Sequence, residues 1–524
     1  MVFSSYPFIF GFLPITLLGF IISSRFGIQA AKYWLCLTSI VFYGWWYIGW
    51  IPVLLASIVL NYGIGWLIIN RANRGLSANG LLMFGVTIDL LAIFYFKYLF
   101  AVLQFFGLDV HWSSMGALPL GISFFTFTQI AFLVDISQGF AERYTPLNYF
   151  LFVTFFPHLI AGPIVHHRDL MPQFEEGKNY RFQPTEVAIG LSIFCIGLAK
   201  KTLIADTVGH FSETLLVGGR LDWKVAWVGI FAYSMQLYFD FSGYSDMAIG
   251  LARLFGIKFP INFDSPYKAT SIIDFWQRWH ITLTRFLTAY TYNPFAVVLV
   301  RRRAAAGLST SKRASKTVPG FLELIALPTL STMLLAGIWH GAGLVFIIFG
   351  VLHGFYISVN HAWRTFGPKY EPRNDKLLGQ IYIILSGLLV YGCVLLAQIF
   401  FRADSVGAAL SILANMTNVP DLTGLTCWPW SSSQCVQPVI LQAPDMPMRE
   451  LAFLAATMAI AWFAPNTQEI MTSYEPGLNL GARRRLPPFL AAIDSPGWAL
   501  AFGLVLFLGL YCIRDGQPFI YFQF

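Results

Sequence analysis

Apolar runs recur along the whole chain and are separated by short polar connections. A helix needs about 20 mainly apolar residues to cross roughly 30 Å of hydrocarbon, whereas a membrane barrel shows alternating segments of about ten residues. Runs of the helical kind occupy residues 7–23, 33–48, 51–69, 80–106, 146–163, 185–205, 224–254, 321–339, 342–360, 378–402, 449–466 and 496–513. The pattern predicts an all-α protein, a polytopic transmembrane helical bundle with about 11–13 membrane segments.

One further apolar stretch, residues 118–135, is irregular because it contains Pro119, Gly121 and several Ser and Thr residues. Irregular backbone is tolerated at membrane depth only where it is packed within protein or lines a cavity. We therefore expect a re-entrant or broken element at this place.

The polar connections are too short to form an independent domain of ordinary size. They comprise residues 164–184, 261–282, 302–320, 364–377, 403–448 and 466–495. No repeat with a period of about 20 to 50 residues is visible, and the two halves of the chain do not resemble each other. We expect a single integral membrane domain over residues 1–524.

Composition and charge agree with a membrane protein and indicate its orientation. Hydrophobic residues make up 56% of the chain and charged residues 11%, and the mean hydropathy is +0.63. Arg25 and Lys32 follow the first run, and the connections around Arg302 and Arg484 are also basic. Because basic residues favour the cytoplasmic side, both termini and the 403–448 connection are expected outside the cytoplasm. The net charge of +8 is therefore mostly topological, and without interleaved stacking aromatics it does not indicate nucleic acid.

The cysteines fall into two groups. Four of them, Cys36, Cys195, Cys393 and Cys512, lie in apolar runs, where a small hydrophobic role is the simplest interpretation. Cys427 and Cys435 lie in the uncharged segment TGLTCWPWSSSQCVQP, which the charge pattern places outside. An oxidising compartment would permit a disulfide between them, so a disulfide and two free thiols both remain open.

Polar groups within the apolar run 224–254 are the next informative feature. Gln236, Asp240 and Tyr244 are spaced four residues apart, so on a helix they form one polar ridge, with Asp246 off it. Burying such groups in a membrane is costly and requires compensation. Two interpretations of the aspartates stay open: a satisfied network between helices, or direct participation in chemistry.

The segment DFWQRWHITLTRF, residues 274–286, contains a second polar cluster. On a continuous helix, Gln277, His280 and Thr284 fall on one narrow arc, while Asp274, Arg278 and Arg285 fall on another. Asp274 and Arg278 are then spaced to form an ion pair. His280 is either a satisfied core histidine or a group that points at a ligand.

The segment LLAGIWHGAGLVFIIFGVLHG, residues 334–354, places His340 and His353 in an apolar run. His340 follows Trp339 and precedes three small residues that would let another chain approach closely. On an unbroken helix, His353 points well away from His340, so the two are not expected to bind one metal ion. Neither histidine has a Glu, Asp or Cys at ligand spacing, and no metal site is expected.

Four segments together carry a family resemblance. FFPHLIAGPIVHHRDL, YFDFSGYSDMAIG, FWQRWHITL and GIWHGAG resemble the signature segments of the membrane-bound O-acyltransferase family. The resemblance is to the bacterial alginate O-acetyltransferase branch, which MVFSS at the start and FYFKY at 94–98 also fit. It extends over about residues 1–405, and the helical region 406–524 is less recognisable.

The resemblance implies an O-acyltransferase with a funnelled helical bundle in the bacterial inner membrane. His340 would be the essential catalytic residue and His280 its partner. The residues expected to contact substrates are Gln277, Trp339, Thr284, Asp240 and Tyr244. No tightly bound cofactor is implied: an acetyl-CoA or acyl-carrier thioester would enter from the cytoplasm, and a polysaccharide or cell-wall glycan hydroxyl would be acylated in the periplasm, with a periplasmic acetyltransferase as a partner.

The residue types suit this chemistry. A hydroxyl that attacks a thioester must lose a proton, which a neutral imidazole can accept. We expect His340 to be this base, and His280 or Gln277 to donate a hydrogen bond to the developing oxyanion. No Cys or Ser has a triad-like neighbourhood, which favours direct transfer over a covalent acyl-enzyme.

Two other classes of function also fit a polytopic chain. A transporter or flippase needs polar groups at membrane depth, and a scaffold subunit of a polysaccharide secretion complex needs no catalytic residue. The segment after His280 departs from the branch's pattern at Phe286, Thr288 and Ala289, so the acceptor polymer stays open.

Overall fold

The structure is a computed structural model whose described residues are helical apart from their connections and one pair of short strands. It describes residues 1–107, 118–140, 144–213, 220–221, 223–368, 376–417, 440–441, 448–478, 495–514 and 519–520. The strands, β1 (Arg220–Leu221) and β2 (Ile440–Leu441), pair in parallel. The prediction of an all-α polytopic membrane protein is confirmed, while Cys427, Cys435 and Arg484 lie outside the described residues.

Within the described part of the chain, seven helical stretches are long and apolar enough to cross a membrane. They are Pro7–Ser24, Ile48–Asn73, Asn79–Gln104, Pro184–Ser212, Val318–His340, Leu344–Phe366 and Leu377–Arg402. Each coincides with an apolar run identified in the sequence. Four further runs form helices that are shorter or more polar: α2 (Ile28–Gly44), α12 (Trp223–Leu254), α21 (Met448–Phe463) and α24 (Pro496–Tyr511).

Two apolar stretches depart from the expected form. The run 146–163 is not one helix but two short ones, α7 (Pro146–Thr154) and α8 (Phe156–Leu159). Pro157 explains the break, because proline has no N–H to donate to the preceding turn and its ring clashes there. The stretch 118–135 is the reverse case: α6 (Ile122–Ser137) is one continuous helix with mostly buried side chains, so the expected break is wrong.

The chain divides into two compact units, and α12 contributes residues to both. The first unit comprises Met1–Leu203, Phe241–Asn262 and Asn466–Phe524, and the second comprises Ile204–Asp240 and Phe263–Pro465. The first contains the two short C-terminal helices α22 (Thr467–Ile470) and η12 (Thr472–Tyr474) as well as α24. The second contains both candidate catalytic histidines.

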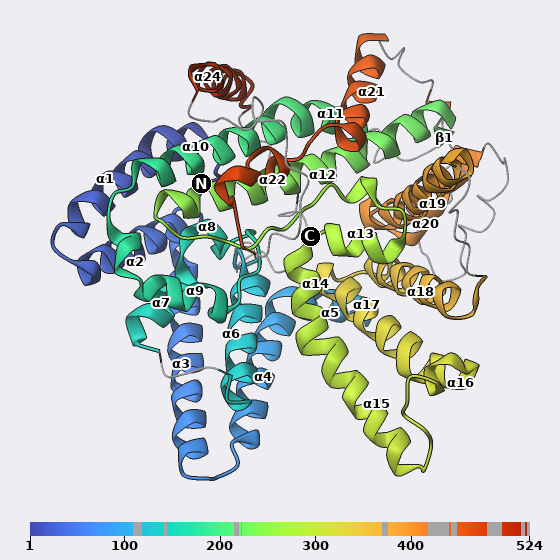
Figure 1. The fold of residues 1–524 in the computed structure, drawn as a ribbon, viewed down its shortest axis with the longest axis horizontal. Coiled ribbons are helices and arrows are strands. Elements are labelled where there is room, and N and C mark those ends of the chain that lie inside the picture. The colour runs from blue at the N-terminus through green and yellow to red at the C-terminus, as the bar shows by residue number, and fades with distance from the viewer. Residues whose placement is uncertain are drawn as a thin grey trace. The chain divides into compact units, whose positions relative to one another are not determined.

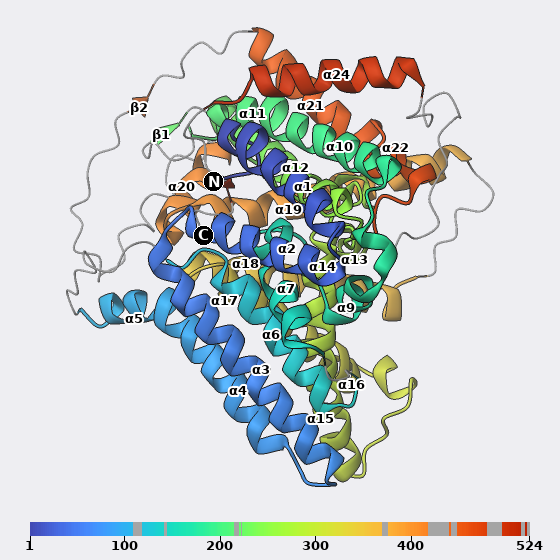
Figure 2. The same ribbon diagram turned by 90° about the vertical axis from the view of Figure 1, so that its left-hand side faces the viewer.

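In the first unit, α3, α4 and α6 lie side by side, and α24 lies along α10 (Figure 2). The remaining elements of this unit are η1 (Pro7–Phe12), α1 (Leu13–Ser24), η2 (Ile48–Trp50), α3 (Ile51–Asn73), α4 (Asn79–Ile93), η3 (Phe94–Tyr98), α5 (Leu99–Phe105), α9 (His167–Glu175), η4 (Gly177–Tyr180), α10 (Pro184–Ala199), α22 (Thr467–Ile470) and η12 (Thr472–Tyr474). The bulged turn η5 (Lys200–Ala205) follows α10 and runs from this unit into the next.

Glycines let α10 and α12 pack closely within the first unit. A Cβ on Gly197 would lie 2.6 Å from the carbonyl oxygen of Gly243, and one on Gly190 would lie 2.7 Å from that of Gly250. Small residues at such spacing let helix backbones approach closely in a membrane. The side chains beside this contact are therefore brought within hydrogen-bonding distance.

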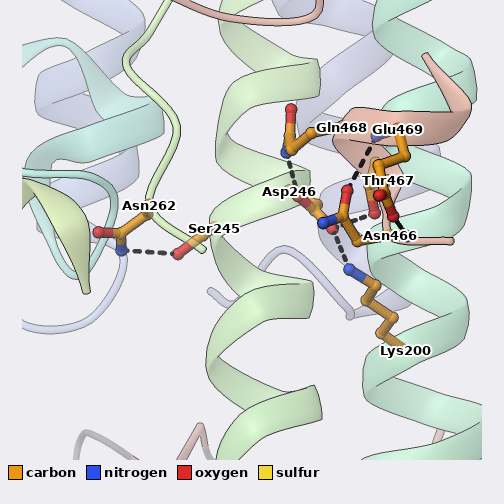
Figure 3. A network of polar contacts seen from close by, with 8 residues as sticks. All are labelled: Lys200, Ser245, Asp246, Asn262, Asn466, Thr467, Gln468 and Glu469. Carbon is orange, nitrogen blue, oxygen red and sulfur yellow. Dashed lines mark hydrogen bonds and ion pairs between the residues drawn. The ribbon is translucent and has the colours of Figure 1, made fainter. Parts of the chain in front are cut away.

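One such side chain is Asp246 of α12, which is buried at the centre of a polar network (Figure 3). Its carboxylate accepts hydrogen bonds from Lys200 Nζ at 2.6 Å, Thr467 Oγ1 at 2.6 Å and Gln468 Nε2 at 3.1 Å. The adjacent Ser245 accepts from the amide of Asn262. For Asp246, the satisfied network between helices is therefore the confirmed interpretation.

The network holds a C-terminal segment against the first unit. Asn466 and Glu469 form a capping box at the start of α22. The next two residues, Thr467 and Gln468, donate their hydrogen bonds to Asp246 of α12. Further along, Lys258 Nζ pairs with Glu475 at 2.8 Å, and this hydrogen bond and charge lower the pKa of the exposed Glu475 carboxyl. The segment 466–478 is thus fixed at both of its ends.

The elements of the second unit are coloured from green to orange in Figure 1, a range that also includes the end of α12, which belongs to the first unit. Its elements are α11 (Asp206–Ser212), the first part of α12, η7 (Pro266–Lys268), α13 (Ile272–Arg278), α14 (Ile281–Leu287), η8 (Thr288–Tyr292), α15 (Asn293–Ala305), η9 (Ala314–Lys316), α16 (Val318–Phe321), η10 (Leu322–Ala326), α17 (Leu327–His340), α18 (Leu344–Phe366), α19 (Lys376–Arg402), α20 (Val406–Thr417) and α21, with the strands β1 and β2.

Candidate active site

His280 occupies a break between two short helices. α13 ends at Arg278, Trp279 is extended, and His280 has a left-handed backbone with φ 43° and ψ 53° before α14 begins. A residue other than glycine is uncommon in this conformation, which persists only where surrounding contacts impose it. The imidazole of His280 is buried.

A backbone hydrogen bond from outside the segment 274–286 accompanies this break. The backbone N–H of Asp264 donates to the carbonyl oxygen of Arg278 at 2.9 Å, an oxygen that a continuous helix would pair with residue 282. The expectation of one helix over 274–286 is therefore wrong, and so are the two polar arcs derived from it. The ion pair within α13 is confirmed, because Arg278 Nε lies 2.7 Å from Asp274 Oδ1.

His340 also lies where a helix ends. It is the last residue of α17, and the backbone is extended at Gly341 and Gly343 before α18 begins at Leu344. A Cβ at Gly341 would overlap the ring of Phe346, so a larger residue here would force that ring to move. The break agrees with the separate apolar runs 321–339 and 342–360, whereas the comparison of His340 with His353 on an unbroken helix does not apply.

The turn folds α18 back along α17, and the two helices pack antiparallel through glycines. A Cβ on Gly337 would overlap the carbonyl oxygen of Phe346, and one on Gly350 would overlap that of Met333. Gly354 likewise approaches the Cα of Leu330. This close packing fixes the end of α17, and with it the position of His340.

The substitution Gly350→Ala is expected to lower the stability of this hairpin by about 1–3 kcal/mol, because an overpacked contact forces backbone shifts. Thermal unfolding of the detergent-purified protein measures the effect. Gly392→Ala is the matched control, since Gly392 also lies within a helix of the second unit and nothing stands within 4 Å of an added Cβ. Equal melting temperatures for the two variants would contradict the close packing.

Aromatic rings connect the three buried histidines of this unit. The ring centroid of Trp339 lies 6.4 Å from that of His280 and 4.9 Å from that of His340. On the other side, the Phe349 ring lies 5.7 Å from His340 and 4.7 Å from His353. The breaks in α13–α14 and α17–α18 thus bring side chains together that a straight helix would separate.

Two residues expected near His280 take other positions. Gln277 is exposed on α13, so its expected role as an oxyanion donor beside His280 has no support in this arrangement. Thr284 is half-buried, and its hydroxyl donates to the carbonyl oxygen of Trp276 at 3.2 Å, which ties α14 back to α13. The Trp339 ring, by contrast, contacts the rings of both His280 and His340, and its contact with substrate stays a prediction.

The expected polar ridge of Gln236, Asp240 and Tyr244 lies on one continuous helix, α12, but its residues belong to different units. Asp240 is buried and belongs to the second unit, where Gln236 accepts a hydrogen bond from Ser212 at 2.6 Å. Tyr244 belongs to the first unit, where its ring stacks on Phe3 at 4.7 Å and on Phe519 at 4.5 Å. The Tyr244 ring thus packs between other aromatic rings, and the substrate contacts expected for Asp240 and Tyr244 stay predictions.

Some residues of the site were missed by sequence reasoning. Trp276 Nε1 donates a hydrogen bond to His353 Nδ1 at 3.2 Å. Phe401 on α19 packs its ring edge-on against His340, with the centroids 5.1 Å apart. The only available signal was the presence of His353 in an apolar run, since no spacing rule connects residues 77 positions apart. Within the described residues, no group of three or more His, Cys, Asp or Glu side chains is arranged to hold a metal ion.

Comparison with known proteins gives a consistent result. The model of the membrane-bound O-acyltransferase family matches residues 78–310. A peptidoglycan O-acetyltransferase from Helicobacter pylori is 38% identical over 451 residues, which cover 80% of each chain. A protein named probable alginate O-acetylase from Azotobacter vinelandii is 32% identical, and the match covers 100% of both chains.

A more distant relative performs a different acyl transfer. A teichoic acid D-alanyltransferase from Streptococcus thermophilus is 26% identical over 250 residues, which cover 47% of this chain and 57% of that protein. The part of this chain that the family model matches includes His280 but ends before His340. The long matches to the two acetyltransferases extend the similarity to most or all of the chain.

Proposed function

The chain belongs to the membrane-bound O-acyltransferase family, in its alginate O-acetylase-like branch, and is an O-acyltransferase; we propose that it transfers an acetyl group from a cytoplasmic thioester to a hydroxyl of an extracytoplasmic glycan. The donor is acetyl-CoA or an acyl-carrier thioester. The acceptor is an exopolysaccharide or cell-wall glycan, reached directly or through a periplasmic acetyltransferase partner. The protein acts as a multi-pass protein of the bacterial inner membrane, with both termini in the periplasm.

The observation that carries the proposal is the arrangement of His280 and His340. Both are buried, both lie where a helix is interrupted, and the ring of Trp339 contacts both rings. An imidazole at such a place can act on a substrate that reaches it. A scaffold or transport function would not require two imidazoles in this arrangement.

In the proposed reaction, the acceptor oxygen attacks the thioester carbonyl carbon, and His340 takes the hydroxyl proton as the carbon–oxygen bond forms. The carbon–sulfur bond then breaks, and the thiolate of the donor leaves and takes the proton from His340. His280 donates a hydrogen bond to the carbonyl oxygen while it carries negative charge. Such a bond is worth most in a site that excludes water, and aromatic rings from α17, α18 and α19 surround His340.

Oriented membrane vesicles test the direction of transfer. Inside-out vesicles that enclose the acceptor glycan are expected to form base-labile acetyl esters in the lumen when acetyl-labelled acetyl-CoA is added outside. Right-side-out vesicles should not, because the donor cannot reach the cytoplasmic face. Vesicles carrying His340→Ala are the matched control.

Two results would contradict the proposal. Labelling of right-side-out vesicles by external donor would overturn the cytoplasmic entry of the thioester. Failure of inside-out vesicles with both acetyl-CoA and an acetyl-charged carrier protein, also when the periplasmic acetyltransferase is enclosed with the glycan and although the parent protein is present and folded, would overturn the transfer itself.

A further inference from the structure

His353 is a buried histidine that the proposed reaction does not use. It lies in the middle of α18, and its Nδ1 accepts a hydrogen bond from the indole N–H of Trp276 at 3.2 Å. An indole nitrogen is only ever a donor, so this geometry requires an unprotonated Nδ1 and a neutral ring. The donor, Trp276, is itself buried on α13.

This hydrogen bond connects the two elements that present the proposed catalytic histidines. Trp276 lies four residues before His280, in the helix that ends at the left-handed turn. His353 lies on α18, whose glycine contacts with α17 fix the end of that helix at His340. A displacement of α13 from α18 would therefore change the separation of His280 and His340.

Three further aromatic rings pack against His353 beside its hydrogen bond to Trp276. Phe275 stacks parallel to the His353 ring at 6.3 Å, and Phe349 and Tyr356 approach it edge-on at 4.7 Å and 5.9 Å. In such apolar surroundings a hydrogen bond is strong, and the loss of one partner leaves the other unsatisfied. The hydrogen bond between Trp276 and His353 is therefore suited to hold α13 and α18 in one relative position.

His353 is not placed to exchange protons with His340. The Phe349 ring contacts both imidazoles and carries no polar atom that could relay a proton. The hydrogen bond of His353 goes to Trp276 instead. Its geometry suits a role in orientation.

We propose that Trp276 and His353 are positioning residues, whose hydrogen bond sets the separation between the turn at His280 and the end of α17 at His340. The inference rests on the proposed function, because it concerns the same pair of histidines. A misplacement of reacting groups by about 1 Å can cost roughly a hundredfold in rate. The bond should thus affect the rate of the chemical step more than the binding of substrates.

Four variants, assayed for acetyl transfer after purification in lipid, test this role. His353→Asn places an amide oxygen near the position of Nδ1 and keeps the acceptor, whereas His353→Leu removes it. Trp276→Phe removes the donor but keeps a ring. We expect His353→Leu and Trp276→Phe to lower kcat about 10- to 100-fold with KM nearly unchanged, and His353→Asn to stay within about threefold of the parent. The double variant Trp276→Phe/His353→Leu should be no slower than either single one.

Three results would overturn the inference: a parental kcat in His353→Leu, equal losses in His353→Asn and His353→Leu, or multiplied losses in the double variant. If His353→Leu does not fold, the comparison of His353→Asn with Trp276→Phe decides, since a near-parental kcat in His353→Asn with a loss of about 10- to 100-fold in Trp276→Phe supports the bond, whereas a parental kcat in Trp276→Phe excludes it. His340→Ala, measured alongside, separates the two hypotheses. Activity in His340→Ala would refute the proposed function, whereas inactivity there with full activity in His353→Leu would refute only the positioning role.

Discussion

Replacement of His340 by alanine is expected to reduce the rate of acetyl transfer about 10²- to 10⁴-fold, which is the contribution typical of general-base catalysis. The protein should still fold, because the imidazole lies among aromatic rings and its removal strands no buried charge. His340→Gln should be as inactive as His340→Ala, since an amide cannot accept the hydroxyl proton. The measurement is O-acetyl transfer to the native acceptor by purified variants, with thermal unfolding recorded for each.

His280 provides the internal comparison. If it donates a hydrogen bond to the oxyanion, His280→Gln should retain more activity than His280→Ala, because the amide keeps a donor. Substantial activity in His340→Gln would remove the general-base role. Parental activity in both position-280 variants would return His280 to a packing role imposed by its left-handed turn.

Much of the architecture could be predicted because long apolar runs specify helices regardless of their partners. The run 224–254 became α12, Trp223–Leu254, and the spacing of Asp274 and Arg278 correctly predicted their ion pair. Both predictions depend only on residues within one or two helical turns. The family, and with it the two histidines as candidates, was visible from short segments of sequence.

The turns that form the site could not be predicted, because their partners lie elsewhere in the chain. The break at His280 is accompanied by a backbone hydrogen bond from Asp264, and a window centred on residue 280 shows only a good helical pattern. In the segment 334–354, the sequence alone indicates that Gly341 and Gly343 let another chain approach closely. The structure uses Gly341 and Gly343 instead as the extended link between α17 and α18.

The pairing of Trp276 with His353 illustrates a further limit. These residues are 77 positions apart, and neither has a local polar partner that would mark it as one half of a bond. Their contact depends on α18 folding back along α17, which in turn depends on glycine contacts between those helices. A single sequence gives the residues but not the fold-back that brings them together.

The substitution Asp246→Ala is expected to destabilise the protein by about 3 kcal/mol, because removal of one partner of a buried ion pair leaves the other charge uncompensated. Lys200 would lose its carboxylate at 2.6 Å, and α22 would lose the acceptor of two hydrogen bonds (Figure 3). The value lies at the lower end of the range for such pairs, since the Lys200 side chain is 14% exposed and can partly recover solvation. Thermal unfolding in detergent and the rate of proteolysis within residues 466–478 are the measurements.

Two further variants distinguish the charge from the hydrogen bonds around Asp246. Thr467→Val removes one uncharged donor to the carboxylate and should cost about 1.5 kcal/mol, less than Asp246→Ala. The double variant Asp246→Leu/Lys200→Met replaces both charged partners with apolar side chains of similar length, so it should be more stable than Asp246→Ala, since no buried charge is left unpaired. If the double variant unfolds at or below the temperature of Asp246→Ala, the loss comes from the detached C-terminal segment rather than from the stranded Lys200 charge. If Asp246→Ala melts with the parent, the network does not hold that segment in place.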